Sequence, residues 1–177
     1  MLFDEKTRRV VRRFEATIAR DPGDAEAHLG MGLWWHWSEM YAKASTRFDR
    51  AVELDPGFAW ALRARAGLLA TCPDPAYRDG EAAVRDAAAA IARARATREL
   101  TINWKHRMFL ETLAAALAEL GDFEAAAEVE REALRYCITR INEETAQARI
   151  AQFQRGERLR LDQGLGRSSV SRRPAAE

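Results

Sequence analysis

The chain has 177 residues, of which 47% are hydrophobic and 31% are charged, and its formal net charge at pH 7 is +1. This length suffices for one domain with a sizeable core, and the balanced charge gives no reason to expect a nucleic-acid or acidic-membrane partner. No apolar run approaches the roughly 18 residues that a membrane span needs, and the N-terminus lacks the apolar stretch of a secretory signal. Cys72 and Cys137 lie far apart without a CxxC motif. We therefore expect a cytoplasmic protein with two unpaired thiols.

Two nearly identical turns divide the first third of the chain. The sequence reads RDPGDAEA at 20–27 and LDPGFAWA at 54–61, which places Pro22 and Pro56 34 residues apart. A fixed period in this range is typical of stacked helical repeats. We expect Asp55 to accept a backbone hydrogen bond within its turn, and the proline that follows it cannot continue the preceding helix.

Helices are expected between these turns. Residues 4–22 read as a single helix, and 25–39 and 41–54 follow as a pair, with apolar residues three and four positions apart. The pattern returns in residues 109–134 at an offset of 82 residues instead of twice 34. Residues 140–161 read as an amphipathic helix that caps the stack, since each repeat buries its apolar face only against its neighbours.

The middle of the chain departs from the regular period. The stretch TCPDPAYRDG interrupts a helix pair, and an alanine- and arginine-rich helix is expected between Ala83 and Trp104. We expect Asp74 and Asp79 to accept backbone N–H groups and cap the helix that follows, while Arg78 helps to hold the loop. A catalytic cluster formed by these three side chains is the alternative.

The first full helix pair resembles a tetratricopeptide repeat. In that motif, small residues mark the contact between the two helices and bulky residues fill the space beside it. The motif positions are held by His28, Met31, Gly32, Trp35, Ala44, Phe48, Ala51 and Pro56. The CPDPAYRDG loop, with the later LETLAAALAELGDF, is similar to a bacterial subtype of this family. The resemblance implies an all-α fold, a right-handed superhelical stack of about seven or eight antiparallel helices.

The resemblance divides the chain into one repeat domain, residues 1–163, and a tail. The expected segments of the domain are a half repeat (4–22), a repeat (25–58), an expanded repeat (59–106), a repeat (107–137) and a C-terminal capping helix (140–161). The tail, 164–177, contains Ser, Gly, Pro and Arg with almost no large apolar residue, and we expect it to be disordered.

The sequence contains no HExxH, GxSxG or P-loop motif. His28 occupies a packing position, His106 lies in a basic turn that reads as surface, and Cys72 is expected to be a small buried thiol. Glu130 stands where the first repeat has Phe48, which predicts a wetter outer face at the last repeat. The sequence thus favours a protein that is not an enzyme and needs neither cofactor nor metal.

In tetratricopeptide arrays the first helices of successive repeats line a concave groove that binds peptides. The resemblance assigns groove positions to Leu29, Leu33, His36 and Trp37, then to Trp60, Arg63, Gly67 and Ala70, and then to Met108, Glu111, Ala115 and Glu119. Apolar and aromatic groups beside an arginine are typical of binding hot spots. We take Leu29, Leu33, His36, Trp37, Trp60 and Arg63 as the candidate partner-binding residues. Within them, Trp37 is expected to pair with Trp60.

These observations predict a non-catalytic scaffold that binds a peptide or helix of a partner protein. Two alternatives remain. In the first, the same apolar surface closes a homodimer. In the second, either the N-terminal half repeat or the C-terminal helix folds back and covers this surface. Family members that clamp a C-terminal carboxylate use lysine and asparagine at positions that hold leucine and alanine here, so we do not expect carboxylate recognition.

Overall fold

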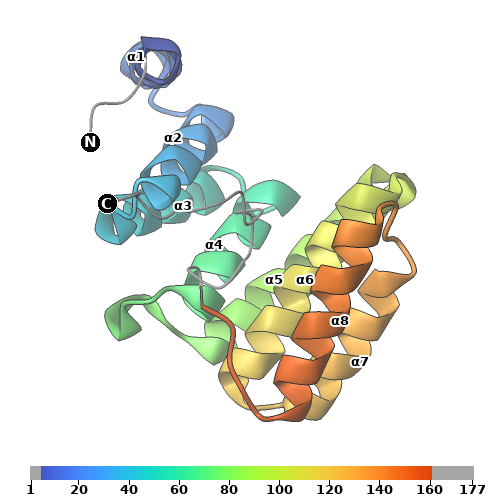
Figure 1. Cartoon of the computed structure of the whole chain (residues 1–177). Coiled ribbons are helices and arrows are strands. Elements are labelled where there is room, and N and C mark those ends of the chain that lie inside the picture. The colour runs from blue at the N-terminus through green and yellow to red at the C-terminus, as the bar shows by residue number, and fades with distance from the viewer. Residues whose placement is uncertain (1–4, 161–177) are drawn as a thin grey trace, which may run out of the picture.

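The computed structural model describes residues 5–160 of the chain, and this part is all-helical (Figure 1). Its eight α-helices are α1 (Glu5–Arg20), α2 (Ala25–Trp37), α3 (Tyr41–Leu54), α4 (Ala59–Thr71), α5 (Gly80–Ala96), α6 (Asn103–Leu120), α7 (Phe123–Leu134) and α8 (Arg140–Gln154). Two 3-10 helices, η1 (Pro75–Tyr77) and η2 (Glu99–Thr101), lie between them. The all-α class and the expected number of helices are confirmed. The tail for which disorder is predicted lies outside the described residues.

The repeated Asp-Pro-Gly turns have the same local structure. Asp21 accepts a hydrogen bond from the backbone N–H of Gly23 at 2.9 Å, and Asp55 accepts one from Gly57 at 2.8 Å. This confirms the role expected for Asp55. After the first turn, Asp24 caps α2 by accepting the N–H of Ala27 at 2.8 Å, so a helix N-terminus follows at once.

Adjacent helices pack against one another along the whole described chain, and α2 and α4, as well as α4 and α6, are also in contact. Figure 1 shows α1, α2 and α3 at one end and α5 to α8 side by side at the other, with α4 between the two groups. We call the surface formed by α2, α4, α6 and α8 the even-helix face. In the described part of the chain, no helix combines the length and the apolar character needed to cross a bilayer.

The core of the first helix pair depends on a close approach of α2 and α3. A Cβ atom at Gly32 would lie 2.6 Å from two ring carbons of Phe48, which is itself fully buried. His28 is buried beside them, and its ring contacts the carbonyl of Pro22 and the guanidinium of Arg47, both at 3.3 Å. The predicted packing roles of Gly32, Phe48 and His28 are therefore confirmed.

One arginine connects three consecutive helices. Arg65 of α4 donates from Nε and Nη2 to the two carboxylate oxygens of Asp86 in α5, at 2.6 and 3.1 Å. Its Nη1 also donates to Asp49 in α3 at 3.3 Å. A bidentate pair of this kind fixes direction as well as distance, so it orients α5 relative to α4.

The two core clusters differ in composition, since the first, which runs from α2 to α7, contains Phe48, Phe109 and several leucines. In the cluster that joins α4 to α8, ten of the twelve buried residues are alanines, and the other two are Phe153 and Leu159. Small side chains allow helices to come close: a Cβ at Gly80, where α5 begins, would lie 2.8 Å from the backbone nitrogen of Leu120. We call these twelve residues the alanine cluster.

Three expectations about this end of the chain are wrong. The long helix expected from Ala83 to Trp104 is broken, because Arg98 has a left-handed φ of 59° and α6 begins only at Asn103. His106 is half-buried instead of exposed, and its ring centroid lies 4.1 Å from that of Tyr136. The outer face at Glu130 is dry, because α8 packs over α7 and buries this side chain completely.

Candidate binding surface on the even-numbered helices

The candidate residues of α2 do not form one exposed surface. Leu29 is 9% exposed and belongs to the core, so its predicted solvent-facing position is wrong. Leu33 is half-buried against the same core. Trp37 is 76% exposed and makes no ring contact with another described residue, so the expected pair with Trp60 is not formed.

His36 lies between helix α3 and the arginine of α4. Its ring centroid is 6.3 Å from that of Tyr41 and 6.1 Å from that of Phe48. Burial, together with the positive charge of Arg63, lowers the pKa of His36 to about 4. The imidazole is therefore neutral at pH 7 and does not offer a charge to a ligand.

Trp60 has a different set of neighbours from the predicted one. Its ring centroid lies 5.0 Å from Phe109 and 6.2 Å from Trp104, and its Nε1 donates to Glu99 at 2.6 Å. The Nζ atom of Lys105 lies 5.7 Å from the Trp60 ring and 5.8 Å from the Trp104 ring. We call Trp60, Trp104, Phe109 and Lys105 the aromatic cluster; Trp104 is its most accessible ring, at 43% exposure.

Arg63 lies beside this cluster and is held on several sides. Its Nη1 donates to the hydroxyl of Thr112 at 3.1 Å, and its guanidinium carbon lies 5.3 Å from the ring centroid of Trp60. Burial lowers the pKa of Arg63 to about 10, against the opposing effect of Glu111. The side chain keeps its charge at neutral pH, and its Nε has no hydrogen-bond partner among the described residues.

Farther along α6 is a buried ion-pair cluster that the sequence did not predict. Glu111 is 6% exposed, so its predicted solvent-facing groove position is wrong. Glu111 accepts from both Arg107 of α6 and Arg149 of α8. Arg149 Nε also lies 2.8 Å from a carboxylate oxygen of Glu130, as an ion pair without a well-directed hydrogen bond. Burial raises the pKa of Glu130 to about 7. The positive charge of Arg149 opposes this shift, whereas the negative charge of Glu111 adds to it.

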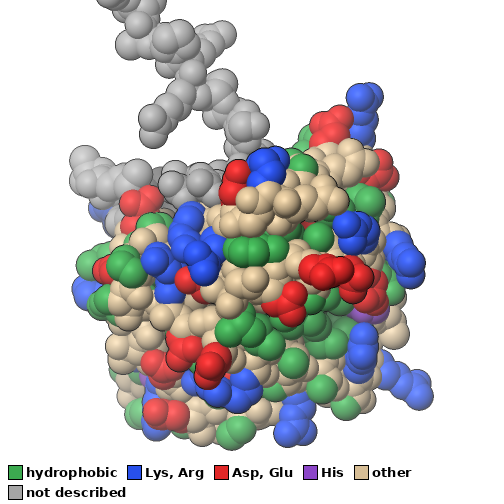
Figure 2. Space-filling view, turned by 90° about the horizontal axis from the view of Figure 1, so that it is seen from below, with side chains coloured by type: hydrophobic (Ala, Val, Ile, Leu, Met, Phe, Trp, Pro, Cys, Tyr) green, Lys and Arg blue, Asp and Glu red, His purple; other side chains and the backbone are tan. Residues whose placement is uncertain are grey.

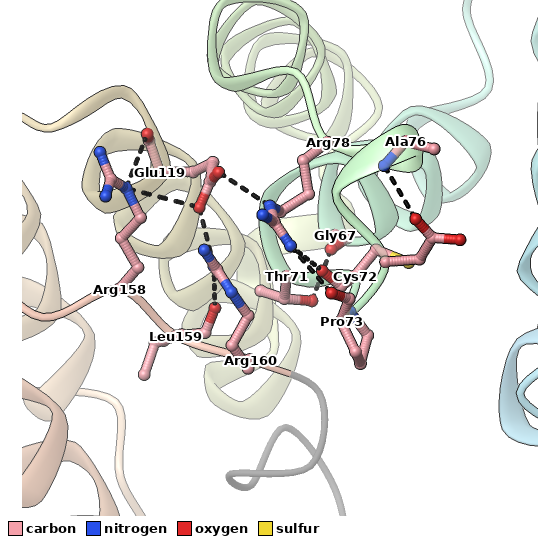
Figure 3. A network of polar contacts seen from close by, with 11 residues as sticks. Gly67, Thr71, Cys72, Pro73, Ala76, Arg78, Glu119, Arg158, Leu159 and Arg160 are labelled. Carbon is pink, nitrogen blue, oxygen red and sulfur yellow. Dashed lines mark hydrogen bonds and ion pairs between the residues drawn. The ribbon is translucent and has the colours of Figure 1, made fainter.

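A third polar group lies at the C-terminal end of α6 (Figure 3). Glu119 accepts from Arg78 Nε at 3.1 Å through one carboxylate oxygen and from Arg160 Nη1 at 2.7 Å through the other. Arg158 donates from Nε to the backbone carbonyl of Glu119 at 3.3 Å and lies 3.7 Å from its carboxylate. We call Arg78, Glu119, Arg158 and Arg160 the latch. It joins the loop after α4, the end of α6 and the segment after α8.

The residues considered for catalysis have structural contacts. Asp74 and Asp79 accept the backbone N–H groups of Ala76 and Ala82, both at 2.9 Å, which confirms the predicted capping roles. Arg78 donates from Nη1 to the carbonyl of Cys72 at 2.9 Å. Cys72 is fully buried, as predicted, and burial raises the pKa of its thiol.

Figure 2 views the molecule from the lower end of Figure 1 and shows acidic and basic side chains interspersed with apolar ones across this face. Among residues 5–160, no three His, Cys, Asp or Glu side chains are grouped so as to hold a metal ion. Comparison of the chain with known protein families, curated proteins and solved structures found no match.

Proposed function

We propose that this chain is a tetratricopeptide-like scaffold that binds a peptide or helix of another protein on its even-helix face. Three features support the repeat architecture. The Asp-Pro-Gly turns recur at 34 residues, Gly32 allows the close contact of α2 and α3, and α4 contacts both α2 and α6. Contacts between alternate helices are those that a continuous right-handed superhelical stack requires, because each repeat buries its face against the next.

The observation that carries the binding function is the aromatic cluster. An accessible tryptophan, Trp104, lies beside a second tryptophan whose orientation is fixed by the hydrogen bond to Glu99. Rigid aromatic side chains contribute contact area at low conformational cost and are enriched among binding hot spots. The charge of Lys105 over both rings gives a partner a polar anchor next to the apolar contact.

Catalysis has no comparable support. The carboxylates of the CPDPAYRDG loop are engaged as caps, and the thiol of Cys72 is buried and held in its protonated form by a raised pKa. We therefore propose a role that is not enzymatic and that acts through protein contact, in the cytoplasm, without a cofactor.

Trp104→Ala tests this proposal, with Trp37→Ala as the matched control. Both side chains are exposed tryptophans, but only Trp104 belongs to the aromatic cluster. The wild-type chain and both variants are used to co-purify partners from the native cell, and each recovered protein is quantified. We expect a partner whose recovery falls at least about tenfold with Trp104→Ala and is unchanged with Trp37→Ala, as hot-spot truncation predicts. If every partner were recovered with Trp104→Ala as well as with the wild-type chain, the aromatic cluster would be removed from the proposal.

Self-association is the second candidate function. It is favoured by Ile138 and Ile141 before and within α8, which are 66% and 70% exposed, because exposed apolar side chains are common at interfaces between copies. Light scattering during size-exclusion chromatography separates the two candidates. A dimer that Ile138→Asp or Ile141→Asp converts to a monomer would support self-association through these side chains, whereas a wild-type monomer excludes it.

A further inference from the structure

After α8, the described part of the chain returns across the molecule. α8 ends at Gln154, Gly156 adopts a left-handed φ of 72°, and the following residues are not helical. Figure 1 shows this red-orange segment running from the lower end of α8 toward the lower end of α4. We call residues 155–160 the strap.

The strap is held by one apolar side chain and the two arginines beside it. Leu159 is 4% exposed and belongs to the alanine cluster, where Phe153 is the only other large buried side chain. Arg158 and Arg160 donate to Glu119 from either side of this leucine. Because alanines cannot fill the space themselves, the leucine supplies the volume that close packing requires.

The strap contacts the predicted binding groove at Glu119, and Leu159 shares the alanine cluster with two further groove positions, Ala70 and Ala115. Both alanines are buried, so their predicted solvent-facing positions are wrong. Gly67, one turn before Ala70 on α4, faces open space, because a Cβ atom there would meet nothing within 4 Å. The covered part of the groove thus begins after Gly67 and ends at the latch.

We propose that the strap is an intramolecular ligand of the even-helix face, and that a partner segment with the same chemistry binds there when the strap is displaced. This inference rests on the proposed function and specifies how one end of the binding surface is regulated. The partner segment is extended, and it carries an aliphatic residue between two arginines. Its aliphatic side chain enters the space lined by Ala70 and Ala115, and an arginine donates to Glu119.

The polar contacts of Glu119 explain this choice of partner chemistry. One carboxylate oxygen accepts from Arg78, which is fixed in the loop after α4 by its bonds to the carbonyls of Cys72 and Pro73. The other oxygen accepts from Arg160 of the strap. When the strap leaves, this second oxygen, in a largely buried carboxylate, loses its donor, and a guanidinium from a partner restores it.

The strap is also weakly enough held to be exchanged. Its side-chain contacts with the body are made by one buried leucine and two arginines, and the Arg158 side chain is 48% exposed. The Arg158 guanidinium also lies 5.9 Å from the Phe123 ring, and Gln152 of α8 donates to the Arg158 carbonyl at 3.1 Å. A short tether gives the strap an effective concentration on the order of 1 mM. For a free peptide with a dissociation constant of about 100 µM, this competition weakens apparent binding about tenfold.

The experiment uses the full chain and a fluorescein-labelled peptide with the sequence QRGERLR, which is that of residues 154–160. Leu159→Asp disables the strap, because it places a carboxylate beside Glu119 and removes the apolar side chain. Fluorescence anisotropy should then show the peptide binding to Leu159→Asp at least about tenfold more tightly than to the wild type. The control peptide QRGERDR should bind neither protein.

A second substitution locates the peptide. Adding Glu119→Gln to Leu159→Asp should weaken peptide binding about tenfold, since a hydrogen bond to a charged group is lost. Circular dichroism confirms that each variant is folded, and Leu159→Ala serves in place of Leu159→Asp if that variant unfolds. The inference is overturned if the folded strap variant binds the peptide no better than the wild type does, or binds it equally well without Glu119.

The outcome also separates this inference from the proposed function. Trp104 lies near the first turn of α6 and Glu119 near its last, so Trp104→Ala should leave binding of the strap peptide unchanged. If partner recovery depends on Trp104 while the peptide never binds, the scaffold stands and the intramolecular ligand is wrong. If the peptide binds but no partner depends on Trp104, the aromatic cluster loses its role instead.

Discussion

Two glycines in consecutive even-numbered helices should respond in opposite ways to the same substitution. Gly32 of α2 faces the buried ring of Phe48, and an added Cβ would lie 2.6 Å from two of its carbons. Gly67 of α4 faces open space. Both lie within helices, so Gly→Ala gives each variant the same gain in intrinsic helix propensity, about 1 kcal/mol.

The packing cost is what distinguishes the two variants. Gly67→Ala has none and should raise the free energy of unfolding by about 0.5–1 kcal/mol. Gly32→Ala must displace Phe48, which is fully buried. Overpacking of this kind costs about 1–3 kcal/mol, so we expect the two variants to differ by about that amount, with Gly32→Ala the less stable.

Urea denaturation followed by circular dichroism measures this difference directly, provided that the m-values of the wild type and both variants agree. For a chain of this size, about 1–3 kcal/mol corresponds to a difference in Tm of roughly 2–12 °C. Equal stability of the two variants would show that α2 and α3 do not approach each other as closely as the structure places them. A Gly67→Ala variant less stable than the wild type would refute the open space beside α4.

Three further outcomes are expected. Burial raises the pKa of Glu130 to about 7, above its ordinary value of 4.5, so the stabilising contribution of the protonated side chain is present below pH 4.5 and is lost as the pH rises to 7. Urea titrations should show the wild type losing up to about 3 kcal/mol of unfolding free energy relative to Glu130→Gln between about pH 5 and 8. Parallel pH dependences of the two proteins would contradict this. Asp79→Ala removes the N-cap of α5 and should lower the free energy of unfolding by about 1 kcal/mol, seen as a lower Tm. In Cys137→Ser, the fully buried Cys72 should react with a thiol reagent only as the protein unfolds, and rapid labelling of the native chain would show that it is accessible.

The helices and turns were predictable because their causes are local. The spacing of apolar residues sets each helix, and Asp55 and Asp79 form bonds with residues only two or three positions away. The break after α5 was missed for the same reason. Arg98 adopts its left-handed conformation among helix-favouring neighbours, and no glycine or proline marks the place.

The candidate surface was less predictable, because it depends on where distant segments pass. Glu130 was expected to face water, but Arg149, on the following helix, pairs with it in the interior. Ala70 and Ala115 were expected in an open groove, but both are buried in the alanine cluster together with Leu159 of the strap.

The alanine cluster has a consequence for how stability varies with temperature. Alanine loses no side-chain rotamer entropy on folding and buries little apolar area. Each buried residue of the alanine cluster therefore adds less hydrophobic stabilisation, but folding also costs it less entropy. The heat-capacity change of unfolding follows the apolar area exposed. Per residue, the alanine cluster should therefore contribute less to this heat-capacity change than the cluster that contains Phe48, Phe109 and Leu110, and its contribution to stability should vary less with temperature.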